Sequence, residues 1–326
     1  MKKISSIKSN NSLEFESFAL EIFQFQAKNN LVYSQFLKLL KINPLEINSI
    51  VDIPFLPIEF FKSHKIVSSN SKIQETFLSS GTTGQTQSKH FVTDVSIYEE
   101  SFTKGFEYFY GSIKNYTVLA LLPSYLERNG SSLIYMANHF IEKSNKPKSG
   151  FYLHNLDELA KNLIELDKKG EKVLLIGVSF ALLDLVESYS FNLKNTIVME
   201  TGGMKGRRKE LIREELHHIL KEGFGVDKIH SEYGMTELLS QAYSKGNGIF
   251  ECPPWMKIIT RDPEDALTTL PEGKSGGINV IDLANINSCS FIATQDLGKT
   301  YPNGSFEVLG RFDNSDIRGC NLLLLK

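Results

Sequence analysis

The central part of the chain alternates between strands that are apolar on both faces and amphipathic helices, and this alternation constrains the fold most strongly. A strand that is apolar on both faces must be covered on both sides, and helices in the connections between parallel strands do this. The sequence therefore predicts an α/β fold with a helix-covered, largely parallel sheet. The expected strands are "YTVLALLP", "FYL", "KVLLIGV", "NTIVMETGG" and "KIHSEYG", with one more leading to Gly81, and the expected helices lie near 94–109, 131–144, 156–169, 180–188 and 207–222.

The two ends of the chain have different patterns. Residues 13–41 carry two helical patterns, and the extended stretch "VDIPFLPIEFF" follows them. Beyond residue 250 the helical patterns stop, and short strand-like runs separated by Gly and Pro replace them: "MKIIT", "GGINVID", "CSFIATQDLG", "SFEVLG" and "NLLLLK". We therefore expect an α/β core with N-terminal helices over residues 1–250, and a β-rich subdomain with a short tail over 251–326.

Composition excludes several classes of function. The 326 residues are 41% hydrophobic and 23% charged, with a formal net charge of -2, and the charges are scattered, so no nucleic acid partner is expected. The longest uncharged apolar run, beginning at Val173, has 11 residues and is far too short for a membrane span. The N-terminus lacks the apolar run of a signal peptide, so a cytoplasmic protein is expected. Cys252, Cys289 and Cys320 have no CxxC spacing and predict neither a disulfide framework nor a zinc site.

Four polar junctions that contain glycine occur where strands are expected to end: "SSGTTG" (79–84), "ETGGMKG" (200–206), "SEYGMTE" (231–237) and "TQDLG" (294–298). In an open α/β sheet, ligands bind at this edge. The first junction is not the common phosphate loop, because Thr86 and Gln87 stand where that motif has its second Gly and its Lys. Each junction alone is also compatible with a solvated turn.

Taken together and in this order, the motifs resemble those of the adenylate-forming superfamily of acyl- and aryl-CoA ligases and luciferases. That superfamily combines a Ser/Thr/Gly loop with Tyr-Gly-x-Thr-Glu, Asp-Leu-Gly and Gly-Arg-x-Asp motifs, and this chain has "SSGTTG", "YGMTE", "DLG" and "GRFD". The details "SSGTTGQTQSKHF", "ETGGMKGRR" and "RGC" are most similar to the acyl-protein synthetase of bacterial luminescence fatty-acid reductase complexes. The resemblance implies the sheet core of the adenylate-forming N-terminal domain.

The resemblance also implies a role for each motif, with ATP and Mg²⁺ as cofactors. Glu237 is expected to bind magnesium, Thr236 to contact the α-phosphate, and Lys89 to assist at the phosphates. The other nucleotide-binding residues implied are Ser79, Ser80, Gly81, Thr82, Thr83 and Gly84 at the β- and γ-phosphates, Gly202, Gly203 and Tyr233 at adenine, and Asp296 and Arg311 at the ribose. Gly234 is a further cofactor-binding residue that the resemblance implies.

The chain departs from the superfamily pattern in two places. Gln85, Thr86 and Gln87 separate the first loop from Lys89, where the superfamily has Gly-x-Pro-Lys. Only 15 residues follow Arg311, so the mobile C-terminal domain that usually follows, with its catalytic Lys, is expected to be lacking. Cys320 lies in this tail, and the related luminescence enzymes carry an acylated Cys near their C-terminus. A thiolate is a natural acceptor for an acyl group, so Cys320 is a candidate nucleophile; a small buried residue is the alternative.

The sequence thus predicts an adenylate-forming ligase that activates a carboxylic acid, by resemblance a fatty acid, as acyl-AMP. The acyl group would pass to a thiol, first Cys320 and then a partner such as a reductase or carrier protein. An acyl-CoA or amide-forming ligase is one alternative. A degenerate nucleotide-binding subunit that serves as a scaffold is another. Cys252 and Cys289 are expected to be structural.

Overall fold

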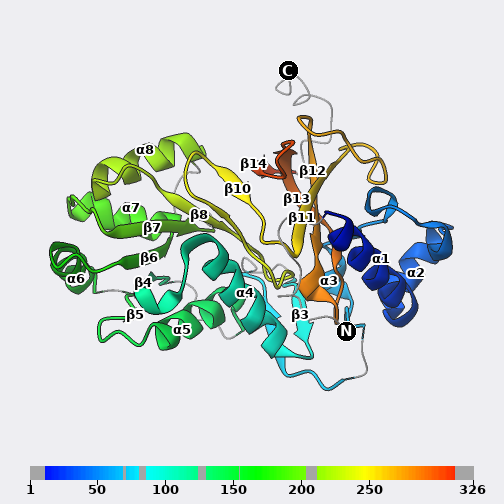
Figure 1. Ribbon diagram of the computed structural model, residues 1–326, viewed down its shortest axis with the longest axis horizontal. Coiled ribbons are helices and arrows are strands. Elements are labelled where there is room, and N and C mark those ends of the chain that lie inside the picture. Colours follow the sequence, from blue (N-terminus) through cyan, green and yellow to red (C-terminus); the bar gives the residue numbers. More distant parts are fainter. Residues whose placement is uncertain are drawn as a thin grey trace. The chain divides into compact units, whose positions relative to one another are not determined.

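Figure 1 shows the computed structural model of the chain, which divides into two compact units. The structure describes residues 12–68, 71–80, 86–123, 130–153, 155–202 and 211–312. The first unit combines Met1–Ser101, Thr236–Ser240 and Glu251–Lys326, and the second combines Phe102–Met235 and Gln241–Phe250. The expected domain boundary at residue 250 stays a prediction.

The second unit contains the predicted parallel strands. Its strand order is β10, β9, β8, β7, β6, β4, β5, and β4 to β8 pair in parallel while β9 pairs antiparallel to β8. Every residue of β4 and β6 is buried, as expected for strands covered on both faces. The strands are β4 (Thr117–Leu121), β5 (Gly150–Phe151), β6 (Val173–Val178), β7 (Thr196–Thr201), β8 (His230–Tyr233), β9 (Ala242–Ser244) and β10 (Ile249–Glu251).

Helices cover both faces of these strands. Figure 1 shows α7 (Ser179–Ser188) and α8 (Arg213–Phe224) along one side, and α4 (Val95–Tyr110) and α5 (Ser132–Ser144) along the other. Consecutive residues of β8 confirm this arrangement: His230 contacts Tyr110 of α4, whereas Ser231 contacts His217 of α8. Helix α6 (Leu156–Lys168) packs against β6, and the 3-10 helix η4 (Ile113–Asn115) precedes β4. The predicted α/β class, with a mixed and largely parallel sheet, is confirmed.

The first unit contains the predicted β-rich segment. Strands β11 (Met256–Arg261), β12 (Ser275–Asp282), β13 (Phe291–Thr300) and β14 (Phe306–Arg311) form an antiparallel series. The short strand β1 (Leu56–Pro57) pairs in parallel with β13. The expected strand "NLLLLK" lies outside the described residues.

The predicted N-terminal helices α1 (Ser12–Asn29) and α2 (Leu31–Leu39) pack in this first unit. The Gln26 amide donates to the carbonyl oxygens of Asn285 and Ile286, each at 3.0 Å, and so joins α1 to the segment between β12 and β13. The stretch expected to be extended also contains helical turns, η3 (Ile50–Asp52) and α3 (Phe60–Ser63), while η2 (Pro44–Glu46) follows α2. Within the described ranges, we find no helix with the length and apolar character needed to cross a membrane.

The strand leading to Gly81 differs from the expectation. Strand β2 (Glu75–Leu78) does not join the parallel sheet but pairs antiparallel with β3 (Lys89–Val92) in a separate two-stranded sheet. Strand β3 was not predicted, and neither were β9 and β10. Because these strands have only three or four residues, their patterns are too short to be distinguished from loops.

Candidate functional site

Glu237 is a nearly buried carboxylate in the first unit, with 5% of its surface exposed. Burial raises the pKa of the Glu237 carboxyl, while a hydrogen bond from Ser88 and the charges of Arg311 and Lys62 favour its ionised form. Ser88 precedes β3, Arg311 ends β14 and Lys62 lies in α3. Segments far apart in the sequence therefore surround this carboxylate with a hydroxyl donor and positive charge.

Buried side chains hold the backbone around Glu237. His90 of β3 places its Nδ1 2.8 Å from the carbonyl oxygen of Thr236, and Asn285 donates to the carbonyl oxygen of Glu237 at 2.7 Å. Asp282, at the end of β12, accepts the backbone N–H groups of Leu239 and Ser240 at 2.7 and 3.0 Å. Thr236 itself is half-buried. The segment 236–240 is thus fixed by side chains outside it.

Asp296 and Arg311, the residues expected at the ribose, lie together. They are register partners of β13 and β14, and Arg311 Nε lies 3.3 Å from Asp296 Oδ1. Asp296 is nearly buried, whereas 72% of the Arg311 side chain is exposed. The structure therefore brings Glu237, Arg311 and Asp296 into one cluster within the first unit, because Arg311 interacts with both carboxylates.

The hydroxyl-rich loop begins and ends on the β2–β3 hairpin. Ser79 Oγ accepts the backbone N–H of Ser88 at 2.9 Å, and the Gln87 amide donates to the carbonyl of Ser79 at 2.8 Å. Ser79 is half-buried and Ser80 is exposed. Four candidate phosphate-binding residues lie outside the described residues: Gly81, Thr82, Thr83 and Gly84.

Lys89 follows Ser88 on strand β3, and its side chain is exposed while those of Ser88 and His90 are buried. Since alternate residues of a strand face opposite sides, Lys89 lies on the face away from the Ser88 contact to Glu237. Its role at the phosphates stays a prediction.

The second unit holds the residues expected at adenine. Gly202 follows β7 with a φ of 68°, a conformation that favours glycine, and its carbonyl accepts the Ser179 hydroxyl at 2.8 Å. Tyr233 ends β8, is 9% exposed and lies edge-on to Phe250, with ring centroids 5.9 Å apart. A Cβ at Gly234 would lie 2.4 Å from Glu232 Oε1, so that carboxyl lies directly against the glycine. Gly203 lies outside the described residues.

A buried polar cluster that the sequence did not predict lies beside Gly202. His217 Nε2 lies 3.5 Å from Glu200 Oε1 and 3.4 Å from Ser231 Oγ. One residue further along β7 and β8, the Thr201 hydroxyl donates to the Glu232 carboxylate at 2.5 Å. Burial raises the pKa of the Glu232 carboxyl to about 7, and the nearby Glu200 adds to this increase.

The Glu232 carboxyl leads to a prediction about stability and pH. Its folded-state pKa of about 7 exceeds the ordinary value of 4.5, so its stabilising contribution is present below about pH 4.5 and is lost as the pH rises through 7. Glu232→Gln stays neutral and should not show this loss. Between pH 5 and pH 8, we expect the variant to gain about 2–3 kcal/mol in free energy of unfolding relative to the wild type, measured by urea denaturation.

Glu272 is exposed and offers a control for this measurement. Glu272→Gln should differ from the wild type by an amount that does not change over the same pH range. If the difference in free energy of unfolding between wild type and Glu232→Gln also stays constant from pH 5 to pH 8, the assigned pKa of Glu232 is contradicted.

Sequence reasoning missed several residues of the site. The sequence motifs assign no role to His90, Ser88, Lys62, Asn285 or Asp282. The alternation of Ser88, Lys89 and His90 could have indicated a strand with two buried polar side chains. Lys62, Asn285 and Asp282 carry no comparable local signal, since their contacts depend on the fold.

The residues present suit a magnesium ion that is held mainly by a nucleotide. Among the described residues, no group of three or more His, Cys, Asp or Glu side chains could hold a metal ion alone. Glu237 supplies one hard oxygen ligand, and Mg²⁺ is commonly held by one or two carboxylates, phosphate oxygens and water.

Several solved structures have a similar fold, among them two CoA ligases. A 2-hydroxyisobutyryl-CoA ligase solved with 2-HIB-AMP and CoA has a TM-score of 0.68 and 13% identity, over 92% of this chain and 69% of that one. ATP-bound MatB from Rhodopseudomonas palustris has a TM-score of 0.53 and 16% identity, over 74% of this chain and 49% of that one. A long-chain-fatty-acid-CoA ligase from Archaeoglobus fulgidus has a TM-score of 0.53 and 15% identity, over 75% and 52%. This chain therefore spans about half the length of MatB.

These similarities define the class of fold, that of the adenylate-forming ligases, as the sequence predicted. No curated protein sequence matches the chain. A sequence model of the LuxE acyl-protein synthetases does match, over residues 5–326. The chain belongs to the LuxE acyl-protein synthetase family.

Proposed function

We propose that this protein uses ATP to convert a carboxylic acid into an acyl-AMP and then transfers the acyl group to a thiol. The cluster of Glu237, Arg311 and Asp296 carries this proposal, since it joins three motifs that the sequence places up to 74 residues apart. Family membership and the shared ligase fold support it. By the resemblance to luminescence enzymes, the acid is a fatty acid.

In the first step, a carboxylate oxygen of the acid attacks the α-phosphorus of ATP, the bond to the bridging oxygen breaks, and pyrophosphate leaves. Negative charge accumulates on the α-phosphate, so hydrogen-bond donors aimed at that group lower the barrier. Thr236 is the proposed donor at the α-phosphate. The donors at the departing pyrophosphate are the hydroxyls and N–H groups of 79–84, assisted by Lys89.

Glu237 is the proposed protein ligand of Mg²⁺. When bound, this ion would screen the phosphate charges from the incoming carboxylate. The hydrogen bond from Ser88 and the positive charges of Arg311 and Lys62 support the role of Glu237, because they favour the ionised form that a metal requires. Burial opposes the ionised form, because it removes water from the carboxylate. A cation could then take the place of that water.

The remaining motifs supply the proposed contacts to the nucleoside. Asp296 is proposed to accept the ribose hydroxyls, with Arg311 Nε beside it at 3.3 Å. Tyr233 is proposed to stack on adenine, with the glycines 202, 203 and 234 allowing the base to approach the backbone.

In the second step, a thiolate attacks the acyl carbon, a thioester forms, and AMP leaves. Cys320 is the proposed first acceptor, and a partner reductase or carrier protein the final one. Burial raises the thiol pKa of Cys252 and of Cys289, the latter to about 12. Both described cysteines are therefore poor nucleophiles at neutral pH, which supports the remaining cysteine, Cys320, as the reactive one.

Pyrophosphate exchange tests the proposed function. The wild-type protein is incubated with ATP, Mg²⁺, labelled pyrophosphate and a panel of carboxylic acids of increasing chain length, and acid-dependent labelling of ATP is expected. Binding of ATP without exchange for any acid would instead indicate a scaffold subunit. Exchange followed by release of acyl-CoA, with no acylated protein, would indicate a CoA ligase.

Asp296→Ala should weaken nucleotide binding. A carboxylate that accepts ribose hydroxyls makes charge-assisted hydrogen bonds, whose loss costs about 1.5–3 kcal/mol. We therefore expect the Kd for ATP, measured by calorimetry, to rise roughly ten- to hundredfold. The ion pair with Arg311 is largely exposed on the Arg side and should contribute little to stability, so the melting temperature should hardly change. An unchanged Kd would remove Asp296 from the ribose site.

A further inference from the structure

The peptide group between Thr236 and Glu237 is held at both of its polar atoms. Its carbonyl oxygen lies 2.8 Å from His90 Nδ1, and its N–H donates to the carboxylate of Glu237 itself. The next carbonyl, that of Glu237, accepts from Asn285 at 2.7 Å. Two successive peptide planes are thereby fixed, and with them the directions in which the Thr236 and Glu237 side chains leave the backbone.

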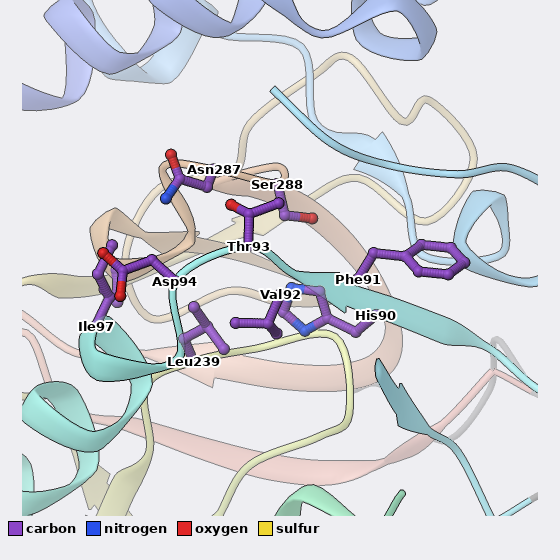
Figure 2. Close-up of a pocket in the computed structure, with 10 residues that line it drawn as sticks. His90, Phe91, Val92, Thr93, Asp94, Ile97, Leu239, Asn287 and Ser288 are labelled. Carbon is purple, nitrogen blue, oxygen red and sulfur yellow. The ribbon is translucent and has the colours of Figure 1, made fainter. Parts of the chain in front are cut away.

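The state of the His90 ring follows from this contact. A carbonyl oxygen only accepts hydrogen bonds, so Nδ1 must carry the proton and donate it. The ring is 0% exposed and lies edge-on to Phe61, with ring centroids 5.7 Å apart. Figure 2 shows His90 beside Val92 and Leu239 in the wall of a small pocket. Packing and the Nδ1 bond therefore determine the position of the ring.

Packing alone does not explain a histidine at this position. Among the described residues, Nε2 and Oδ1 of Asn285 are buried and make no hydrogen bond of ordinary length and angle, although the Asn285 side chain interacts with the His90 ring. A buried polar atom without a hydrogen-bond partner destabilises the fold, and a phenylalanine would fill the same space without that atom. Within the described part of the chain, the hydrogen bond of ordinary geometry that the ring makes is the one from Nδ1 to the Thr236 carbonyl.

We propose that His90 is a positioning residue for acyl-adenylate formation, which acts through the Thr236 carbonyl to orient Thr236 and Glu237. The proposal rests on the proposed function, in which these two residues face the α-phosphate and the metal. In this role His90 acts through the Thr236 peptide group and is not itself a ligand of the metal. The Nδ1–H group of His90 holds the Thr236–Glu237 peptide plane so that the Glu237 N–H can donate to the Glu237 carboxylate. This second hydrogen bond sets the orientation of the carboxylate.

Errors in such positioning have large kinetic consequences. A displacement of about 1 Å in a catalytic group can reduce a rate roughly a hundredfold, even when the altered residue is distant from the chemistry. His90 acts on the two residues that are proposed to face the α-phosphate and the metal, so the loss should appear in kcat and not in the KM for the acid.

Three substitutions separate positioning from packing. The side-chain amide of His90→Asn reaches the place of Nδ1 and can donate to the Thr236 carbonyl. The longer side chain of His90→Gln places its amide near the position of Nε2. His90→Phe keeps the volume of the ring but has no hydrogen-bond donor. Relative to wild type, we expect kcat for acid-dependent pyrophosphate exchange to fall about 10- to 100-fold in the Gln and Phe variants. The Asn variant should stay within about threefold of the wild type, and the KM for the acid should change little in all three.

The outcomes distinguish the inference from the proposed function. Rescue by Asn but not by Gln, in variants that melt as folded proteins, would support positioning through Nδ1. Equal losses in Asn and Gln, or a Phe variant with wild-type kcat, would overturn the inference while leaving the proposed function intact. A wild-type protein that shows no exchange with any acid would overturn both.

Discussion

Glu237→Gln should reduce carboxylate-dependent ATP–pyrophosphate exchange by roughly a thousandfold or more, because glutamine keeps the shape of the side chain but removes the charge that binds the metal. The loss should appear at saturating ATP and acid. Exchange is measured with labelled pyrophosphate over a series of magnesium concentrations, and excess magnesium should restore little of the rate.

The same substitution should not weaken the fold. Burial raises the pKa of Glu237, so ionising this side chain costs more in the folded state than in the unfolded state, and a neutral amide removes that cost. We expect the melting temperature of Glu237→Gln to equal or exceed that of the wild type above pH 7. Glu272→Gln removes an exposed carboxylate and serves as the charge-matched control, with unchanged exchange. Near-normal exchange in Glu237→Gln would remove this carboxylate from the active site, and an unfolded variant would indicate a structural role.

Cys320→Ser should abolish acylation of the protein while leaving adenylate formation in place. Acyl-AMP forms before the thiol acts, so pyrophosphate exchange should stay within about twofold of wild type. Serine has no thiol, so the variant forms no thioester. After incubation with ATP, magnesium and a labelled acid, the wild type should carry a label that hydroxylamine removes, and the variant should carry none.

Cys252→Ser is the matched control for this experiment, since Cys252 is half-buried and its thiol pKa is raised by burial. This variant should label normally. A wild-type protein that exchanges pyrophosphate and acylates free CoA, yet never labels at Cys320, would contradict acylation of the protein. Labelling that requires an added partner would instead indicate that the partner completes the transfer site.

The pattern of local sequence was sufficient to predict the α/β part of the fold. Strands β4 and β6 consist of buried residues throughout, and the helices between the parallel strands show a clear helical period, so both could be recognised from one segment at a time. The β2–β3 hairpin could not be assigned in this way. Whether a four-residue strand joins a parallel sheet or pairs with its neighbour depends on packing that the segment itself does not encode.

The order of the motifs likewise predicted the class of protein, and the family match confirms it. The motifs also predicted Asp296 and Arg311 as neighbours at one site, and they are register partners in the structure. The roles of these residues stay predictions, and the candidate phosphate-loop residues and Cys320 lie outside the described part of the chain.

The sequence by itself determined the layered α/β architecture and the family to which the motifs point, because hydrophobic periodicity and motif spacing are properties of short segments. Only the tertiary structure decided what surrounds those motifs. His90 and Thr236 are 146 residues apart, and Asn285 and Glu237 are 48 apart. A hydrogen bond forms where the folded chain brings a donor to an acceptor, and no local pattern records which distant residue that will be. The contacts that orient Glu237 therefore became visible only in the folded molecule.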